Sequence, residues 1–317
     1  MGGSMRIVFM GTPAFAVPSL EALIADGQTI AAVVAQPDRP RGRGLAPTAP
    51  PVAEAARRAG LEVLQPERVR DPAFIEKVSS LAPELVAVVA FGQILPKDLL
   101  DLPPRGCINV HASLLPKYRG AAPIQWAILR GEEVTGVTTM YMNEQMDAGD
   151  LLLSREVPIL PGETAGALSE RLSEAGAGLL VETIRGLAEG SLEARPQDPA
   201  RVTMAPRLRK EDGRVRWEEP ARDILSRVRA VTPWPGAFTT LGGRDLKIWA
   251  ACPAEGSSGG AAPGTVLRAD SGGVLAAAGD GGTVALHELQ LAGKKRMSAG
   301  EFLRGTPVRP GEVLGAS

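Results

Sequence analysis

The chain has 317 residues, of which 44% are hydrophobic and 22% charged, with a net charge of −1 and a pI of about 6.2. A disordered chain would have fewer apolar residues and more net charge, and a bilayer span would need about 20 consecutive apolar residues, which this sequence nowhere contains. We therefore expect a globular protein of two domains, without a membrane span and without a general preference for polyanions.

In the first half, apolar runs that end at turn residues predict strands, and apolar residues at helical spacing predict helices between them. Strands are expected at residues 6–10, 29–35, near 63, 85–90, 107–110 and 134–142, and helices at 15–24, 52–59, after a cap at 71, and at 164–189. Because strands alternate with helices and four strands are apolar throughout, we predict an α/β fold with a doubly wound, mainly parallel sheet. The ligand site of such a sheet lies beyond the carboxyl ends of its strands.

The second half has a different pattern. Residues 195–206 contain prolines and few large apolar residues, which predicts a linker. Beyond them, short β-prone runs are separated by glycine-rich turns, at residues 214–217, 237–241, 246–250, 264–267, 274–277 and 283–289, and only 221–229 shows helical spacing. Closure removes the exposed edges of many short strands, so we predict a smaller β-barrel domain. The expected domains are residues 5–194 and 207–317, joined by the linker.

Cysteine and histidine content limits the chemistry. The only cysteines, Cys107 and Cys252, are too few for a disulfide framework, and no apolar leader with a cleavage site precedes the first strand, so we expect a cytoplasmic protein. With His111 and His287 as the only histidines, we expect no metal site. The turn after the first strand lacks the second and third glycines of a dinucleotide-binding loop, and no Walker sequence occurs, so NAD and nucleotides are not favoured.

Asn109 and His111 stand at the end of a predicted strand. Side chains alternate across a strand, so both point to the face opposite Ile108 and Val110, at the edge where a doubly wound sheet binds ligands. They could satisfy only local backbone groups, but two polar residues in an apolar strand cost desolvation unless they have partners, which favours a functional role. Asp147 lies in a turn-like sequence, and it could hold one tautomer of His111 if the fold brings the two together.

Two clusters of basic residues occur in glycine-containing loops. Arginine beside glycine favours contact with phosphate, because the guanidinium group forks onto phosphate oxygens and glycine lets the backbone approach. A solvated loop is the alternative for both clusters. From residue 207 onward, 16 Lys and Arg stand against 12 Asp and Glu, a modest surplus that either reflects chance or indicates an anionic partner. The clusters are Arg39, Arg41 and Arg43 in the first, and Lys294, Lys295 and Arg296 in the second.

Seven segments together resemble the methionyl-tRNA formyltransferases, from Met5 to about Val313. They are residues 8–13 (VFMGTP), 36–40 (QPDRP), 91–96 (FGQILP), 107–116 (CINVHASLLP), 119–125 (RGAAPIQ), 146–150 (MDAGD) and 233–236 (PWPG). The resemblance implies a formyltransferase-like sheet domain, an OB-like barrel, and 10-formyltetrahydrofolate as co-substrate without a metal. It also implies a catalytic trio of Asn109, His111 and Asp147. The residues that it implies for folate binding are Phe91, Gly92, Ile94, Leu95, Ser113, Leu114, Leu115, Pro116 and Asp150.

The tRNA-using branch adds the arginine loop and the C-terminal barrel, and the resemblance implies that both contact the acceptor arm. The implied tRNA contacts are Arg39, Arg41, Arg43, Lys210, Lys294, Lys295 and Arg296. One departure is visible, because Leu45 and Ala46 follow the loop glycines where this branch often has lysines. The electrostatic contribution of this loop to tRNA binding is therefore expected to be smaller.

The expected activity is formyl transfer to the α-amino group of methionine on initiator methionyl-tRNA, for translation initiation, by a monomer. A formyltransferase that acts on a small amine, such as glycinamide ribonucleotide or an amino sugar, is an alternative that would use the same trio but does not need the barrel. An RNA-binding module without catalysis is a second alternative, and it leaves the trio unexplained. Stabilisation by folate analogues would distinguish the enzymes from the binding module.

Overall fold

The computed structural model of the chain describes residues 4–41 and 46–316. These residues form two compact units, and each is described by itself. The first unit comprises Met1–Pro123, Val134–Pro158 and Ser169–Ala205, and the second comprises Ile124–Glu133, Ile159–Leu168 and Pro206–Ser317. The units are therefore interleaved along the chain, whereas the expected division runs in sequence order.

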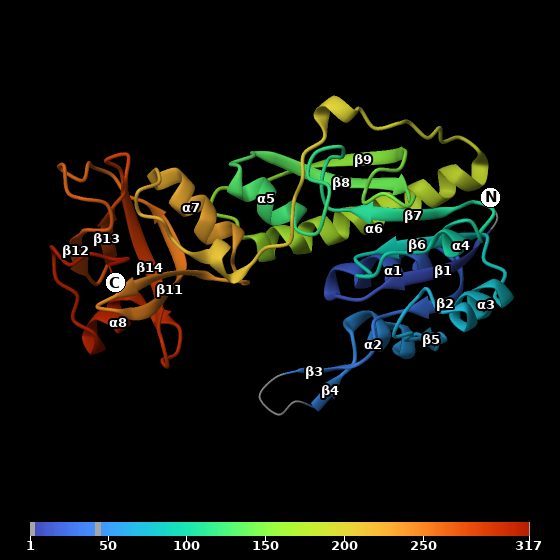
Figure 1. The fold of residues 1–317 in the computed structure, drawn as a ribbon, viewed down its shortest axis with the longest axis horizontal. Coiled ribbons are helices and arrows are strands. Elements are labelled where there is room, and N and C mark those ends of the chain that lie inside the picture. Colours follow the sequence, from blue (N-terminus) through green and yellow to red (C-terminus); the bar gives the residue numbers. More distant parts are fainter. Residues whose placement is uncertain (1–3, 42–45, 317) are drawn as a thin grey trace. The chain divides into compact units, whose positions relative to one another are not determined.

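A seven-stranded sheet forms the centre of the first unit, in the order β5-β2-β1-β6-β7-β8-β9 (Figure 1). The strands from β5 to β7 are parallel, and β8 and β9 are antiparallel, so the predicted mainly parallel sheet is confirmed. The strands are β1 (Arg6–Gly11), β2 (Thr29–Val34), β5 (Val63–Leu64), β6 (Leu85–Val89), β7 (Cys107–His111), β8 (Val134–Tyr141) and β9 (Leu151–Pro158).

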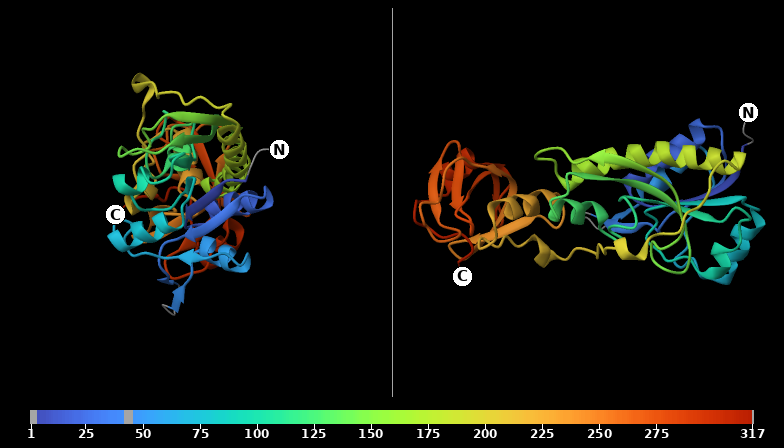
Figure 2. Two further views of the ribbon diagram at one scale, coloured as in Figure 1. Left: turned by 90° about the vertical axis from the view of Figure 1, so that its right-hand side faces the viewer. Right: turned by 90° about the horizontal axis from the view of Figure 1, so that it is seen from above.

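Helices cover both faces of this sheet, because alternate residues of the buried strands enter two different cores. Ile7 and Phe9 of β1 pack in one core with α1, α2 and α6, whereas Val8 and Met10 pack in the other with α3 and α4. The long helix α6 runs along one face of the sheet (Figure 2). The helices are α1 (Val17–Ala25), α2 (Pro51–Arg58), α3 (Pro72–Ser80), α4 (Lys97–Leu100) and α6 (Ala165–Glu189).

The arginine-rich segment was expected to be a loop, and this expectation is wrong for its described part. The strands β3 (Arg39–Arg41) and β4 (Ala46–Thr48) form an antiparallel hairpin in which Arg39 pairs with Thr48. In Figure 1 this hairpin extends away from the seven-stranded sheet. The fixed φ of proline is compatible with extended backbone. Pro40 and Pro47 pair with each other, and on an isolated two-stranded ribbon neither has to donate a backbone N–H to a further strand.

The second unit contains a six-stranded antiparallel sheet in the order β10-β11-β14-β13-β12, with β15 paired to β14. Strands β10 and β12 lie at its two edges, and the C-terminal tail contacts both. Val266 of β12 donates a backbone hydrogen bond to Glu312, and Gly315 donates one to Thr240 of β10. The strands are β10 (Ala237–Leu241), β11 (Arg244–Pro253), β12 (Val266–Asp270), β13 (Gly273–Ala277), β14 (Thr283–Leu291) and β15 (Met297–Ser298), and the helices of this unit are α5 (Pro123–Leu129), α7 (Ala221–Ala230) and α8 (Ala299–Gly305).

The predicted elements of this half are largely confirmed, with three differences. The run 214–217 is not a strand, because only Arg214 forms an isolated bridge, to Phe238. The helix α8 and the short strand β15 were not predicted. None of the helices in the described part of the chain has the length and apolar character that a bilayer crossing requires.

Candidate active site

Alternation along β7 places the predicted polar pair on one face. Ile108 and Val110 pack in the core that contains α6, whereas Cys107 packs in the opposite core. Asn109 and His111 follow Cys107 at intervals of two residues and therefore share its face. The strand ends at His111, so both side chains lie at or near its carboxyl end, as the sequence predicts.

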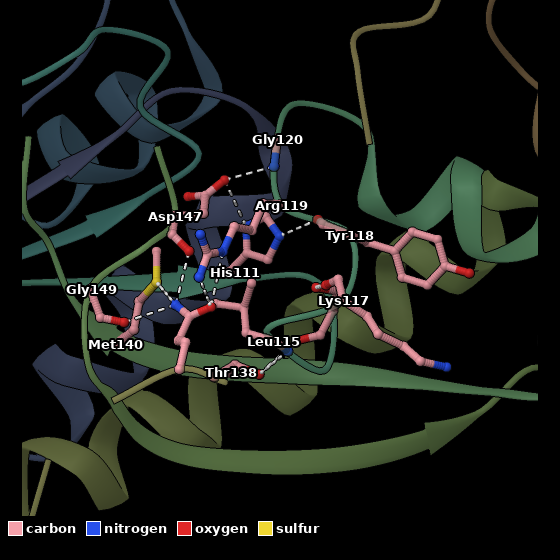
Figure 3. A network of polar contacts seen from close by, with 12 residues as sticks. His111, Leu115, Lys117, Tyr118, Arg119, Gly120, Thr138, Met140, Asp147 and Gly149 are labelled. Atoms are coloured by element: carbon pink, nitrogen blue, oxygen red, sulfur yellow. Dashed lines mark hydrogen bonds and ion pairs between the residues drawn. The ribbon is translucent and has the colours of Figure 1, made fainter. Parts of the chain in front are cut away.

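The ring nitrogens of His111 have different surroundings (Figure 3). Nε2 lies 2.8 Å from the carbonyl oxygen of Tyr118, and Nδ1 lies 3.7 Å from Oδ2 of Asp147. A carbonyl oxygen only accepts, so Nε2 must carry the hydrogen and donate it. Nδ1 is then the position at which His111 gains or loses a proton.

Asp147 is held in place by the backbone. Its Oδ2 accepts a hydrogen bond of 2.8 Å from the amide of Gly120, and its own φ is 50°, in the left-handed region. The 3.7 Å separation from His111 is too long for a hydrogen bond, so the carboxylate acts on the imidazole through its charge. The side chains of His111 and Asp147 are only 7% and 16% exposed, and solvent therefore screens this interaction less than it would at the surface.

Asn109 is half-buried, and among the described residues its carboxamide makes no hydrogen bond. Leaving a partly buried amide without a partner costs free energy, and polar groups in such positions are normally paired. The carboxamide is thus available to donate to a ligand at the end of β7.

The loop that contains Asp147 is fastened by a residue of the predicted linker. Nε2 of Gln197 donates to the carbonyl oxygens of Asp147 and Gly149, at 2.9 and 2.8 Å, and its Oε1 accepts from Nε and Nη2 of Arg119, at 3.0 and 2.7 Å. Gln197 is not among the residues that the sequence predicts for the site. No local pattern points to it, because its partners are distant in the sequence.

The segment after Gln197 also pairs with the loop that follows β7. Arg119 donates its backbone N–H to Thr203 and accepts from Ala205, at 2.9 and 2.7 Å, and Tyr118 donates its N–H to Oγ1 of Thr203 at 2.8 Å. Gly120 has a φ of 121°, and a Cβ there would lie 2.7 Å from the carbonyl oxygen of Ala205. Both groups that position His111 and Asp147, the Tyr118 carbonyl and the Gly120 amide, therefore lie in a loop that this segment holds.

A hollow of about 150 Å³ adjoins Asp147, between the loop after β6 and the loop between β8 and β9. Of the predicted site residues, it brings together Asp147, Ile94 and Leu95. Ile94 is 78% exposed and Met146 is 59% exposed, which is unusual for large apolar side chains at a polar site. The lining residues are Gln93, Ile94, Leu95, Met140, Tyr141, Met142, Asn143, Glu144, Gln145, Met146, Asp147, Ala148 and Gly149.

The other predicted folate residues lie outside the lining of this hollow. The Phe91 carbonyl accepts hydrogen bonds from Thr12 and Gln36, which ties together the loops after β1, β2 and β6, and Gly92 follows with a φ of 89°. Asp150 is exposed at the start of β9.

The segment of Ser113, Leu114, Leu115 and Pro116 is held internally. Oγ of Ser113 donates to the Lys117 carbonyl, and the Leu115 amide donates to Oγ1 of Thr138. Ser113 and Leu115 are buried.

The predicted tRNA contacts occur in both units. In the first, Arg39 is exposed and pairs with Glu67 at 3.3 Å, the side chain of Arg41 is not described, and Arg43 lies outside the described residues. In the second, Lys210 is exposed at the start of a short 3-10 helix, and Lys294, Lys295 and Arg296 are exposed in the turn between β14 and β15.

Cys107 is on the same strand face as the polar pair but is chemically inert at neutral pH. Its side chain is 2% exposed, and burial raises the pKa of its thiol to about 12. Catalysis through a thiolate at this position is therefore excluded. Within the described residues, no three His, Cys, Asp or Glu side chains are grouped to hold a metal ion.

Known proteins share both parts of this sequence. Residues 5–184 match the family described as formyl transferase, and residues 207–307 match the formyl transferase C-terminal domain. The methionyl-tRNA formyltransferase of Pelobacter propionicus is 52% identical over 314 residues, which cover 99% of this chain and 97% of that protein. The chain belongs to the methionyl-tRNA formyltransferase family. The protein of that name from Bacillus velezensis is 50% identical to this formyltransferase, and the match covers 98% of each chain.

Solved structures confirm the predicted fold class of this formyltransferase. HypX from Aquifex aeolicus, in complex with tetrahydrofolic acid, has a TM-score of 0.67 at 20% identity and covers 99% of this chain and 51% of its own. WlaRD, a sugar 3N-formyl transferase, has a TM-score of 0.68 at 17% identity and covers 93% of this chain and 100% of its own.

Proposed function

We propose that this formyltransferase transfers the formyl group of 10-formyltetrahydrofolate to the α-amino group of methionine on initiator methionyl-tRNA, for translation initiation. The observation that carries the proposal is an identity of about one half to methionyl-tRNA formyltransferases over nearly the whole of both chains. That identity extends through the second unit, where residues 207–307 match the formyl transferase C-terminal domain.

The described residues fit a folate beside Asp147. Ile94 and Met146 offer apolar surface to an aromatic ring system at the hollow, and the carboxamide of Asn109 has no partner within residues 4–41 and 46–316. We propose that Phe91, Gly92, Ile94, Leu95 and the segment 113–116 hold the folate, with Asp150 at the rim. Ser113, Leu115 and Pro116 are buried, so they would contribute through their backbone and the shape of the segment, whereas Leu114 is half-buried. When bound, the folate supplies the formyl group.

Asn109 is proposed to stabilise the charge that develops during transfer. When an amine attacks a formyl carbon, negative charge accumulates on the formyl oxygen. A neutral amide donor aimed at such an oxygen contributes about 3 kcal/mol to the transition state. The unpaired carboxamide at the end of β7 is suited to this role because it needs no rearrangement to donate.

His111 is proposed to move the proton that the attacking amine must lose. Its Nε2 is committed to the Tyr118 carbonyl, so Nδ1 would accept the proton and pass it to the folate nitrogen that carried the formyl group, as the bond from that nitrogen to the formyl carbon breaks. The carboxylate of Asp147, 3.7 Å away, then stabilises the imidazolium. This mechanism requires neither a metal nor a covalent intermediate.

We propose that residues 5–194 form the catalytic domain, that 195–206 connect it, and that 207–317 bind tRNA together with the hairpin. The proposed contacts are Arg39, Arg41, Arg43, Lys210, Lys294, Lys295 and Arg296. The surplus of basic residues beyond residue 207 supports this, since backbone contacts depend on positive charge and not on sequence reading.

The deciding experiment measures transfer of labelled formyl from the folate to three acceptors: charged initiator tRNA, glycinamide ribonucleotide and an amino sugar. We expect efficient transfer only to the tRNA. Preferred transfer to a small amine would replace the proposal with the small-acceptor alternative. Binding of tRNA without transfer to any acceptor would favour an RNA-binding module.

We also propose that the protein acts as a monomer in the cytoplasm. Both cysteines are free, which suits a reducing compartment. Sedimentation at micromolar concentration tests the oligomeric state, and fractionation of cells tests the compartment.

A further inference from the structure

One side of the antiparallel sheet in the second unit carries aromatic and cationic side chains in register. Phe238 of β10 pairs with Lys247 of β11, and Lys247 pairs with Gln290 of β14. Strands β11 and β14 lie side by side in Figure 1. The intervening residues are buried, among them Leu246, Ile248 and Leu289. The row from Phe238 to Gln290 therefore lies on the outer face of the sheet.

Trp249 is the centre of this face. The ammonium group of Lys247 lies 5.6 Å from the centroid of its ring, and the guanidinium carbon of Arg296 lies 5.0 Å from it. The indole N–H donates to Oε1 of Gln290 at 3.0 Å, which fixes the ring on the sheet. At the β10 edge, the guanidinium carbon of Arg214 lies 5.7 Å from the centroid of Phe238.

The cations of this face are exposed. Lys247 and Arg214 are exposed, and Lys294 and Lys295 are exposed in the adjoining turn. Arg296 pairs with Glu288, yet its side chain remains 51% exposed. The face thus presents an excess of positive charge around two aromatic rings.

Such a combination matches the surface that single-stranded nucleic acids require. Unpaired bases stack on aromatic rings and on guanidinium planes, while lysine and arginine contact the phosphates between them. The guanidinium group of Arg296 above the indole therefore adds a second plane on which a base can stack. In a double-stranded stem the faces of the bases are covered by neighbouring base pairs, so the aromatic side chains could not stack on them.

We infer that this face, formed by Arg214, Phe238, Lys247, Trp249, Gln290 and Arg296 and here called the stacking face, binds unpaired nucleotides of the tRNA substrate. The inference rests on the proposed function for the identity of the RNA. It adds base stacking on an aromatic ring to the charge contacts proposed for the turn at Lys294 and Lys295.

The test compares Trp249→Leu with Trp249→Phe in the full-length protein. Leucine keeps apolar bulk but has no aromatic face, whereas phenylalanine keeps one. We expect Trp249→Leu to raise KM for charged initiator tRNA about 5-fold or more, and Trp249→Phe to raise it by less. Neither should change kcat at saturating tRNA or the affinity for folate.

Arg268→Ala is the matched control for Arg296→Ala. Arg268 lies in the same unit, is 63% exposed and pairs with an acidic residue, Asp270, as Arg296 pairs with Glu288. If only charge mattered, both variants would weaken tRNA use equally. We expect Arg296→Ala to raise KM at least 3 times as much as Arg268→Ala.

A direct measurement does not depend on variants that fold. Photo-crosslinking of the unmodified protein to an unpaired oligouridylate carrying 4-thiouridine should label Trp249 or Phe238, and a duplex RNA of equal charge should compete weakly. Labelling elsewhere, or an unchanged KM for Trp249→Leu in a protein that formylates tRNA, would overturn the stacking face. Failure of the unmodified protein to formylate tRNA, with crosslinking retained, would overturn the proposed function alone.

Discussion

Gln197 and Asp147 are linked by a hydrogen bond of 2.9 Å, from the side-chain amide of one to the backbone carbonyl of the other, although they lie 50 residues apart. The geometry beside His111 therefore depends on a segment that the sequence marks only as a connection.

Replacing Gln197 by Ala removes both donors to the Asp147 loop and the acceptor for Arg119. We expect kcat for formylation to fall by up to about 30-fold, since two hydrogen bonds of about 1 kcal/mol each hold the loop. Gln197→Glu should be no better, because it keeps the acceptor but has no donor for the loop carbonyls. Arg201→Ala, an exposed residue of the same segment, is the control, and equal losses in both variants would contradict the positioning role.

Replacing Asn109 by Asp or Ala removes the donor proposed for the formyl oxygen. We expect kcat to fall about 100-fold in either variant with little change in melting temperature. Asn109→Asp is the sharper test because it keeps the size of the side chain. Turnover at the level of the unmodified protein would remove Asn109 from the catalytic set.

Asp147→Asn keeps an acceptor for the Gly120 amide but removes the charge that faces His111. An imidazolium beside a neutral amide is less stable than one beside a carboxylate, so kcat should fall, by about 10-fold. His111→Ala should lower kcat about 100-fold. Turnover of Asp147→Asn at the level of the unmodified protein would mean that the charge of Asp147 does not act on His111.

Replacing Arg39, Arg41 and Arg43 together by Ala should weaken tRNA use and leave folate binding intact. The slope of log Kd for tRNA against log salt should decrease by about 2, because each phosphate contact contributes about 0.9 or less. The ion pair with Glu67 reduces the contribution of Arg39 to this slope. An equal loss of folate affinity would make the hairpin part of the folate site.

Burial of the Cys107 thiol makes the free energy of unfolding depend on pH. The unfolded chain releases the thiol proton near pH 9, whereas the folded protein keeps it to about pH 12. Unfolding is therefore favoured by rising pH across this window, and the free energy of unfolding should fall by about 1.4 kcal/mol per pH unit from this group. Denaturant titrations at pH 8, 9 and 10 should show a shallower decline in Cys107→Ala than in Cys252→Ala.

The sequence predicts those parts of the site that follow from local periodicity. Asn109 and His111 share a face because side chains alternate along any strand, and the apolar neighbours Ile108 and Val110 identify which face is buried. The same reasoning predicts the two-sided core and the long helix α6. These features require no knowledge of distant partners.

Gln197 could not be predicted in this way. Its function depends on carbonyl groups of Asp147 and Gly149 and on a guanidinium group 78 residues away, none of which leaves a pattern around it.

The hairpin β3–β4 was missed for a related reason. Prolines and glycines indicate a turn, but pairing across it depends on which residues face each other.

The C-terminal tail has a consequence for self-association. Glu312 accepts from Val266 at one edge of the antiparallel sheet, and Gly315 donates to Thr240 at the other. Unpaired strand edges are templates on which further chains can add. A short segment that occupies an edge blocks this addition and so suppresses fibre growth. Residues 312–316 therefore cover part of both edges, and we expect that removing them would expose these edges and increase aggregation while leaving the active site unchanged.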